Sequence, residues 1–299
     1  MPLILPSLQT RGKAMPDSTC LTHYCTISTE RTTMPLPSVD IPHSTPWETV
    51  FGLAQLTDDP HTWMLTGGLM TQLHALMHHV DIRPTTDTDF LINVLSYEHS
   101  VMRVRNDLVT LGFTIRQGSL SQYTTRMVKG DQTVDLLVDN HLSPRQQRRA
   151  FLGTNRMLGM PGSRKALQRH MQVTLSFQDE NAIIETPDLL GALLMKIASW
   201  REAPQGNIDR HLVDAATLAS LIDSPEQELL RLNNASDSDR KNVRTLHQVL
   251  SNPTDYWWRN MPEEQRNNGL RTVAIPSLLI EMPRKADMRA WLDKHYGLL

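Results

Sequence analysis

The feature that most constrains the fold is a short apolar run that ends at two glycines and leads into a helical pattern. The run Trp63-Met64-Leu65-Thr66 is followed by Gly67-Gly68. After the glycines, apolar residues recur at the spacing of one helix face: Leu69, Leu73, Leu76, Met77 and Val80. The pattern predicts a strand, a tight turn and a helix. A helix that starts at Pro46, capped by Ser44 or Thr45, is expected before them.

A second buried strand is predicted at residues 87–94, where Asp87-Thr88-Asp89 precedes an apolar, β-favouring stretch. A helix over residues 97–111 follows and ends at Gly112. Residues 113–116, 123–128 and 133–138 read as three short strands, the last two joined by the turn Lys129-Gly130-Asp131. These elements predict a mixed sheet with helices against it.

The second half of the chain has the spacing of helices instead. Apolar faces occur at residues 189–200 and 212–221, and further helices are expected near residues 225–232, 239–250 and 285–295. We therefore expect an α+β protein in which a mixed sheet flanked by helices precedes a mostly helical domain. The expected parts are a flexible Ser/Thr/Pro-rich extension at 1–45, a sheet domain at 46–185 and a helical domain at 186–299.

Composition excludes several classes of protein. The 299 residues are 39% hydrophobic and carry a formal net charge of -2, which is typical of a globular chain. No apolar run is long enough to span a membrane, and the N-terminal one is too short for a signal peptide, so we expect a cytoplasmic protein. Two cysteines exclude a disulfide framework, and Cys20, His23 and Cys25 lack a fourth zinc ligand. His74 and His78 lack a third ligand and are expected on a helix surface.

Three carboxylates carry the chemistry that the sequence predicts. Asp87 and Asp89 are two residues apart on one strand, so their side chains point to the same face. Like charges so close are tolerable around a divalent cation, and carboxylate oxygens suit Mg²⁺ or Mn²⁺ when substrate phosphates supply other ligands. Asp135 lies in an otherwise apolar strand, where it would complete the metal site or accept a proton. Gly67 and Gly68 would let backbone N–H groups approach a phosphate.

These segments resemble a known family. Leu65-Thr66-Gly67-Gly68, Gln72-Leu73-His74 and Arg83-Pro84-Thr85-Thr86-Asp87-Thr88-Asp89-Phe90 are similar to the signature of polymerase-β-type nucleotidyltransferases, especially the AbiEii-like toxins. In that family the glycine turn and the Arg-x-Thr-x-Asp-x-Asp-like stretch bracket the nucleotide, which implies that Arg83 and Thr85 contact it.

The resemblance continues into the helical half, at residues 190–200 with Lys196 and at His211-Leu212-Val213-Asp214-Ala215. It implies that Lys196 contacts nucleotide phosphates and that Asp214 orients this lysine or the base. Asp209 is an alternative to Asp214.

A basic stretch between His141 and His170 contains no Asp or Glu and carries a charge of +7. Its basic residues are Arg145, Arg148, Arg149, Arg156, Arg164, Lys165 and Arg169. Such a stretch beside a phosphate-handling cleft would bind a nucleic-acid backbone, and the alternative is a solvated linker.

The sequence therefore predicts a metal-dependent enzyme that moves a nucleoside monophosphate from an NTP to an acceptor hydroxyl. The resemblance implies tRNA as the acceptor, and a toxin of a type IV toxin–antitoxin system with a cognate antitoxin as its partner. Two alternatives stay open: a catalytically silent member of the fold that binds nucleotide or RNA, and a nucleotidyltransferase that modifies small molecules such as aminoglycosides.

Overall fold

Strands β3 (Asp87–Ile92) and β6 (Gln132–Asp139) form the centre of the main sheet and run parallel to each other. The sheet order is β2–β3–β6–β5–β4, with β9 paired to β6 off this path. The other strands are β2 (Trp63–Thr66), β4 (Thr114–Ile115), β5 (Arg126–Lys129) and β9 (Gly159–Met160). The computed structural model describes residues 35–81, 84–116, 125–202, 208–284 and 286–297. The mixed sheet that the sequence predicts is confirmed.

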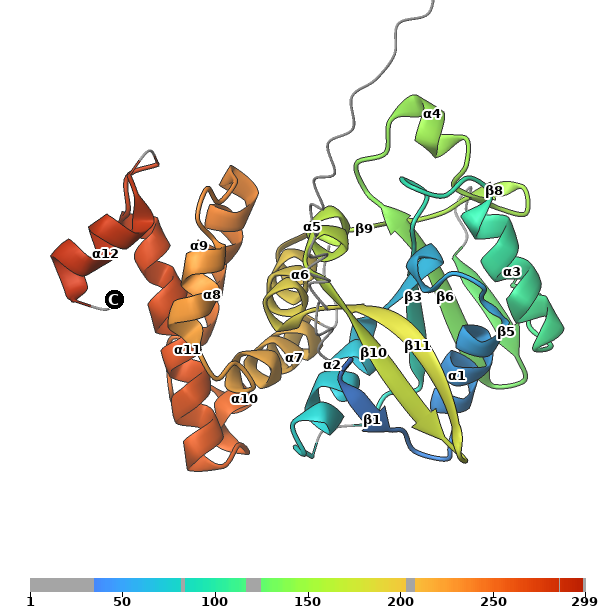
Figure 1. The fold of residues 1–299 in the computed structure, drawn as a ribbon, viewed down its shortest axis with the longest axis horizontal. Coiled ribbons are helices and arrows are strands. Elements are labelled where there is room, and N and C mark those ends of the chain that lie inside the picture. The colour runs from blue at the N-terminus through green and yellow to red at the C-terminus, as the bar shows by residue number, and fades with distance from the viewer. Residues whose placement is uncertain (1–34, 82–83, 117–124, 203–207, 285, 298–299) are drawn as a thin grey trace, which may run out of the picture. The chain divides into compact units, whose positions relative to one another are not determined.

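The two faces of this sheet pack against different helices (Figure 1). Phe90 and Ile92 of β3 join a core cluster with α1 (Trp47–Leu56) and α3 (Ser100–Thr110). Leu91 points the opposite way and joins a cluster with α6 (Leu189–Glu202) and α7 (Ile208–Ser220). Because alternate residues of a strand face opposite sides, Asp87 and Asp89 share the face that looks toward α6 and α7.

The N-terminal elements follow the predicted order. Helix α1 is followed by a 3-10 turn (Pro60–Thr62), β2 and then α2 (Gly67–Met77), which begins at the first glycine of the Gly-Gly pair. Gly130 and Asp131 form the turn between β5 and β6, and Gly130 has a φ of +58°. The short loop fixes the register of the hairpin, so that Arg126 pairs with Asp135.

The structure corrects three expectations. Ser38–Asp40, which we placed in the flexible extension, form β1 and pair with β10 (His170–Phe177). No strands were predicted between residues 150 and 186, yet β10 and β11 (Glu180–Pro187), of eight residues each, form an antiparallel hairpin there. The helix α11 (Glu263–Glu281) was also missed, because its first half is polar and Pro276 lies inside it. Cys20 and Cys25 lie outside the described residues.

Residues 144–168 connect the sheet to this hairpin through short elements. These are α4 (Pro144–Gln147), β7 (Phe151–Leu152), β8 (Asn155–Arg156), β9 and α5 (Ser163–Gln168). The rest of the chain is helical as predicted, with α8 (Pro225–Arg231), α9 (Asp237–Leu250), α10 (Tyr256–Arg259), α11 and α12 (Met288–Tyr296) after α7.

The helical part shares its core with the sheet. Met64 of β2, Met70 of α2 and Leu91 of β3 pack in one cluster with residues of α6 and α7. From Leu36 onward the chain forms one compact unit. This arrangement places α6 and α7 over the acidic face of the sheet. Within the described ranges, no helix combines the length and apolar character that crossing a bilayer requires.

Candidate functional site

A row of polar side chains crosses four strands at one register. Thr66 of β2 is opposite Asp89 of β3, Asp89 is opposite Asp135 of β6, and Asp135 is opposite Arg126 of β5. Residues paired across neighbouring strands lie on the same face of a sheet. The structure therefore brings Asp89 and Asp135 together, with Asp87 two residues along on the same face. The predicted convergence of acidic residues from two separate strands is present in this geometry.

Asp89 packs directly against the glycine turn. Gly67 has a φ of +68°, and a Cβ placed on it would lie 1.8 Å from Asp89 Oδ2. Only glycine fits this contact, because it tolerates the left-handed conformation and has no side chain. Asp89 is half-buried and makes no ion pair with any described residue. Burial, reinforced by the nearby Asp135 and Asp87, raises the pKa of Asp89 to about 6, although Lys196 and Arg210 act in the opposite direction.

Asp135 is engaged by its neighbours on β5. Arg126 donates from Nε to Asp135 Oδ1 at 3.0 Å and from Nη2 to Oδ2 at 2.7 Å. The Thr125 hydroxyl donates to Oδ1 at 3.2 Å. We expected Asp135 to complete a metal site or to accept a proton, but both of its oxygens already accept hydrogen bonds. In this arrangement Asp135 holds an arginine.

Asp87 is half-exposed and lies 3.6 Å from Arg210 of α7. The sequence reasoning did not single out Arg210, since the contact joins residues more than a hundred positions apart. The guanidinium offsets one of the carboxylate charges at the open side of the site. It shows that α7 contributes a cation to the acidic face of the sheet.

The predicted pair on the helices is formed. Lys196 Nζ of α6 donates to Asp214 Oδ2 of α7 at 2.7 Å, and their side chains are only 5% and 4% exposed. Asp209 is exposed and instead interacts with Tyr256, where its charge raises the pKa of the tyrosine hydroxyl in addition to the effect of burial. Asp214 is thus the aspartate that lies beside the lysine. Lys196 is close enough to Asp89 to favour its ionised form.

Of these groups, Asp89, Lys196 and Arg210 line a pocket of about 470 Å³ between the sheet and the helices. Its walls include Gly67, Asp89, Met195, Lys196, Ser199, Glu202, Arg210 and His211. Burial, followed by the charges of Lys196 and Arg210, lowers the pKa of His211 to about 4, so its imidazole is neutral at pH 7. His211 is part of a quoted sequence motif, but no role was predicted for it; its Nδ1 is buried without a hydrogen-bond partner in the described structure.

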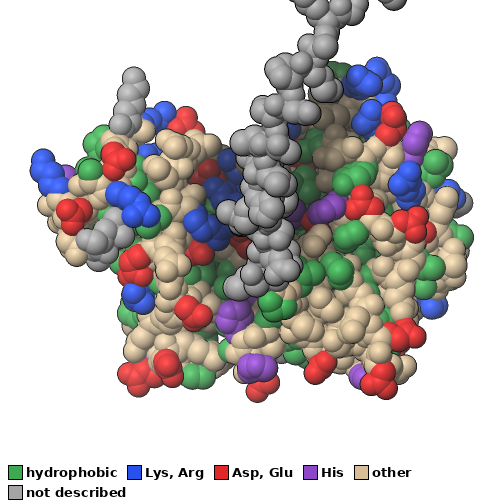
Figure 2. Space-filling view, in the orientation of Figure 1, with side chains coloured by type: hydrophobic (Ala, Val, Ile, Leu, Met, Phe, Trp, Pro, Cys, Tyr) green, Lys and Arg blue, Asp and Glu red, His purple; other side chains and the backbone are tan. Residues whose placement is uncertain are grey.

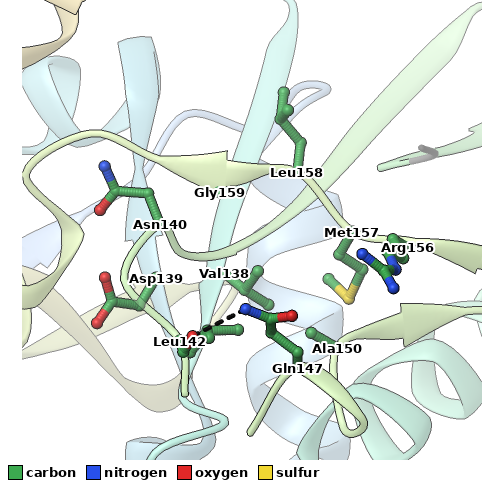
Figure 3. Close-up of a pocket in the computed structure, with 10 residues that line it drawn as sticks. All are labelled: Val138, Asp139, Asn140, Leu142, Gln147, Ala150, Arg156, Met157, Leu158 and Gly159. Atoms are coloured by element: carbon green, nitrogen blue, oxygen red, sulfur yellow. Dashed lines mark hydrogen bonds between the residues drawn. The ribbon is translucent and has the colours of Figure 1, made fainter. Parts of the chain in front are cut away.

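A second pocket of about 320 Å³ adjoins the first and shares Leu158 and Gly159 with it. Figure 3 shows it at the end of β6, where Gln147 donates to the backbone carbonyl of Leu142 across the opening. Asn140 and Arg156 add polar groups to walls that are otherwise mainly apolar. The two pockets form neighbouring hollows along the end of the sheet.

The other residues that carry the family resemblance at positions 65–90 do not line the first pocket, as far as the structure describes them. Gly68 is part of α2, and Thr85 packs against it, because a Cβ at Gly68 would lie 2.9 Å from Thr85 Oγ1. Arg83 lies outside the described residues. His74 is fully buried, and its Nε2 lies 2.8 Å from the Pro187 carbonyl. The expectation that His74 lies on the helix surface is therefore wrong.

Six of the seven basic residues of the stretch fall into two groups, and the seventh, Arg156, is exposed and lines the second pocket. Arg164 pairs with the buried Asp139, while Lys165 and Arg169 pair with the buried Asp239 of α9. These three side chains are used within the fold. The second group is Arg145, Arg148 and Arg149, which line a hollow with Met102 and Phe151. Arg149 pairs with Glu98, whereas Arg145 and Arg148 are exposed and make no ion pair with described residues. Basic side chains gather over α4, at the upper right of the molecule (Figure 2).

The acidic face suits a divalent cation at Asp87 and Asp89 rather than at all three carboxylates. No group of three or more His, Cys, Asp or Glu side chains within the described ranges is arranged to hold a metal ion. Mg²⁺ commonly takes only one or two protein carboxylates and completes its shell with water and substrate phosphates. Asp89 has no ion-pair partner among the described residues and its pKa is raised, so its charge is the one that a cation would stabilise most.

Comparison with known proteins adds no relative. No family model, curated protein or solved structure matches the chain.

Proposed function

We propose that this protein is a metal-dependent nucleotidyltransferase that moves a nucleoside monophosphate from an NTP to an acceptor hydroxyl. The observation that carries the proposal is the alignment of Asp89 with Asp135 on parallel strands, beside Asp87 and against Gly67 at the start of α2. A strand pair that presents carboxylates next to a helix N-terminus can hold a cation and a phosphate side by side.

Each described side chain has a role in this proposal. Asp87 and Asp89 would hold Mg²⁺ or Mn²⁺, which when bound would neutralise charge on the transferring phosphoryl group. The first backbone N–H groups of α2 lack intrahelical partners and would bind phosphate oxygens. Lys196, held by Asp214, and Arg210 place positive charge on the other wall of the pocket. The helices and the sheet would together enclose the nucleotide.

The acceptor and the biological role are proposed from the family resemblance. An acceptor RNA such as tRNA would contact Arg145 and Arg148, which are exposed and make no ion pair with a described residue. A toxin role in a type IV toxin–antitoxin system, with a cognate antitoxin, belongs to the same proposal. Arg164, Lys165 and Arg169 are excluded from the proposed RNA contact because Asp139 and Asp239 already hold them.

The test is transfer of label from each α-³²P-labelled NTP to total tRNA in the presence of Mg²⁺. Wild-type protein should label the RNA, and Asp87→Asn or Asp89→Asn should lower the rate by roughly 100-fold or more, as loss of a charge-stabilising group does in other enzymes. Asp131→Asn is the matched control, because this aspartate is exposed in the turn of the same sheet. Its rate should equal that of wild type.

Other outcomes separate the alternatives. Mg²⁺-dependent binding of a non-hydrolysable NTP without any transfer would support a catalytically silent, nucleotide-binding protein. Transfer to an aminoglycoside but not to RNA would support the small-molecule enzyme. Equal transfer by wild type and Asp89→Asn would contradict the proposed site.

A further inference from the structure

Arg126 of β5 belongs to the row of polar side chains that includes Asp89 and Asp135, although it does not line the 470 Å³ pocket. Arg126 pairs in register with Asp135, and its side chain lies on the same face as Asp89. Neighbouring strands are about 4.8 Å apart, so Arg126 stands roughly 10 Å from Asp89 across two strand spacings. A guanidinium at that distance is near enough to contact a ligand that is bound to Asp89. The Asp87 and Asp89 charges, in addition to Asp135, raise the pKa of Arg126.

The contact with Asp135 leaves part of the guanidinium available. Arginine has five N–H donors, and Asp135 takes one from Nε and one from Nη2. Three N–H groups remain, and the Arg126 side chain is 40% exposed against 15% for Asp135. The buried partner thus fixes the plane of the guanidinium while its other edge faces solvent.

The charge balance of the site favours an anion once a cation is present. Among the described residues, five carboxylates, those of Asp87, Asp89, Asp135, Asp214 and Glu202, face four cationic side chains, Arg126, Arg210, Lys196 and Arg201, the last of which pairs with Glu202. One negative charge is in excess, and a divalent cation would reverse the sign. Arg126 of β5 and Arg210 of α7 then both present guanidinium donors that can bind oxyanion groups.

We infer that Arg126 forms an anion-binding subsite for a phosphate group of the bound nucleotide, and that Asp135 is its positioning residue and not a third metal ligand. The link to a nucleotide rests on the proposed function. The subsite itself requires only a polyphosphate. Because Asp135 already orders the Arg126 guanidinium, anion binding loses less side-chain conformational entropy.

Two binding measurements test this inference on the full-length protein. The first is calorimetric binding of inorganic tripolyphosphate in the presence of Mg²⁺. Arg126→Gln should weaken it by about tenfold or more, because charge-assisted hydrogen bonds to phosphate are lost. Asp135→Asn should also weaken it, but should have no further effect in the Arg126→Gln background, since the aspartate acts through the arginine. Arg103→Gln, an exposed arginine on α3, is the control and should bind like wild type.

The second measurement is Mn²⁺ binding in the absence of any nucleotide, followed by electron paramagnetic resonance of the free ion. Asp135→Asn should retain the wild-type affinity within about twofold, whereas Asp89→Asn should lose about tenfold or more. Thermal unfolding of each variant establishes that it is folded at the assay temperature. Any variant that is not folded is replaced by the conservative Arg126→Lys or Asp135→Glu.

The results separate this inference from the proposed function. Unchanged tripolyphosphate binding by Arg126→Gln, equal effects of Asp135→Asn in both backgrounds, or Mn²⁺ loss in Asp135→Asn as large as in Asp89→Asn would each overturn it. If the binding results are as expected but no label is transferred to RNA, the anion subsite stands and the transferase proposal fails. If label is transferred to RNA but Arg126→Gln binds tripolyphosphate like wild type, the transferase proposal stands and the anion subsite at Arg126 fails.

Discussion

Replacing Gly67 by alanine tests how closely the glycine turn and Asp89 fit each other. The alanine would have to keep a φ near +68°, and its Cβ would overlap Asp89 Oδ2 at 1.8 Å, Cγ at 2.6 Å and Cβ at 2.8 Å. The left-handed conformation costs an alanine about 1–2 kcal/mol, and forced shifts in a packed site cost about 1–3 kcal/mol more. The free energy of unfolding should therefore fall by about 2–5 kcal/mol.

Gly130→Ala is the matched control, because Gly130 has a φ of +58° and nothing within 4 Å of a Cβ placed on it. It should lose only the backbone contribution, about 1–2 kcal/mol. Any stabilisation through the unfolded chain is common to both variants and cancels in their difference.

Urea unfolding followed by tryptophan fluorescence measures both losses. In an Asp89→Gly background the overlap is absent, so the cost of Gly67→Ala should fall to that of Gly130→Ala. Equal losses for Gly67→Ala and Gly130→Ala in the wild-type background would refute the contact between Gly67 and Asp89.

Three further predictions concern titration and charge. Because the pKa of Asp89 is raised from 3.8 to about 6, the folded state retains a proton that the unfolded state has released, and stability falls as pH rises through this range. The free energy of unfolding of Asp89→Asn, measured with urea, should rise relative to that of the wild type by at most about 3 kcal/mol between pH 4 and pH 7; no relative rise would contradict the raised pKa. Burial lowers the pKa of His74 from 6.5 to about 4, so its contribution to stability is full above pH 6.5 and is lost as pH falls toward 4. The free energy of unfolding of the wild type should fall between pH 7 and pH 5, and in His74→Leu this decrease should be smaller by about 2 kcal/mol. A decrease equal to that of the wild type would disprove the prediction. Arg164→Gln should destabilise the fold by about 1–3 kcal/mol, because it removes a charged hydrogen bond from buried Asp139. Arg148→Gln should leave stability within about 0.5 kcal/mol and weaken RNA binding in a filter assay; the opposite pattern would reverse our division of the basic stretch.

Local patterns were sufficient to predict the elements around the site. The run that ends at Gly67-Gly68 specifies β2 and α2, because apolar spacing and glycine both act over a few residues. The hairpin of β5 and β6 is similarly local. Its two-residue turn at Gly130 and Asp131 sets Arg126 opposite Asp135, so counting back from the turn would have identified Arg126 as the partner of the aspartate.

Long-range pairing could not be predicted in the same way. Nothing in the sequence near Asp89 specifies that β3 lies beside β6 in parallel, and the contact of Arg210 with Asp87 depends on how α7 packs over the sheet. Strand β10 did carry a local signal that we missed, because Met171, Val173, Leu175 and Phe177 alternate with polar residues as in a half-buried strand. The basic stretch was counted as one charged surface, since sequence does not reveal that Asp139 and Asp239 are buried against three of its members.

The most direct measurement is a crystal structure of the protein soaked with Mn²⁺ and a non-hydrolysable NTP, with anomalous data that locate the ion. We predict an anomalous peak that places Mn²⁺ within bonding distance of carboxylate oxygens of both Asp87 and Asp89, with the triphosphate between the start of α2 and Lys196. A peak elsewhere, or a nucleotide bound away from this face of the sheet, would contradict the account.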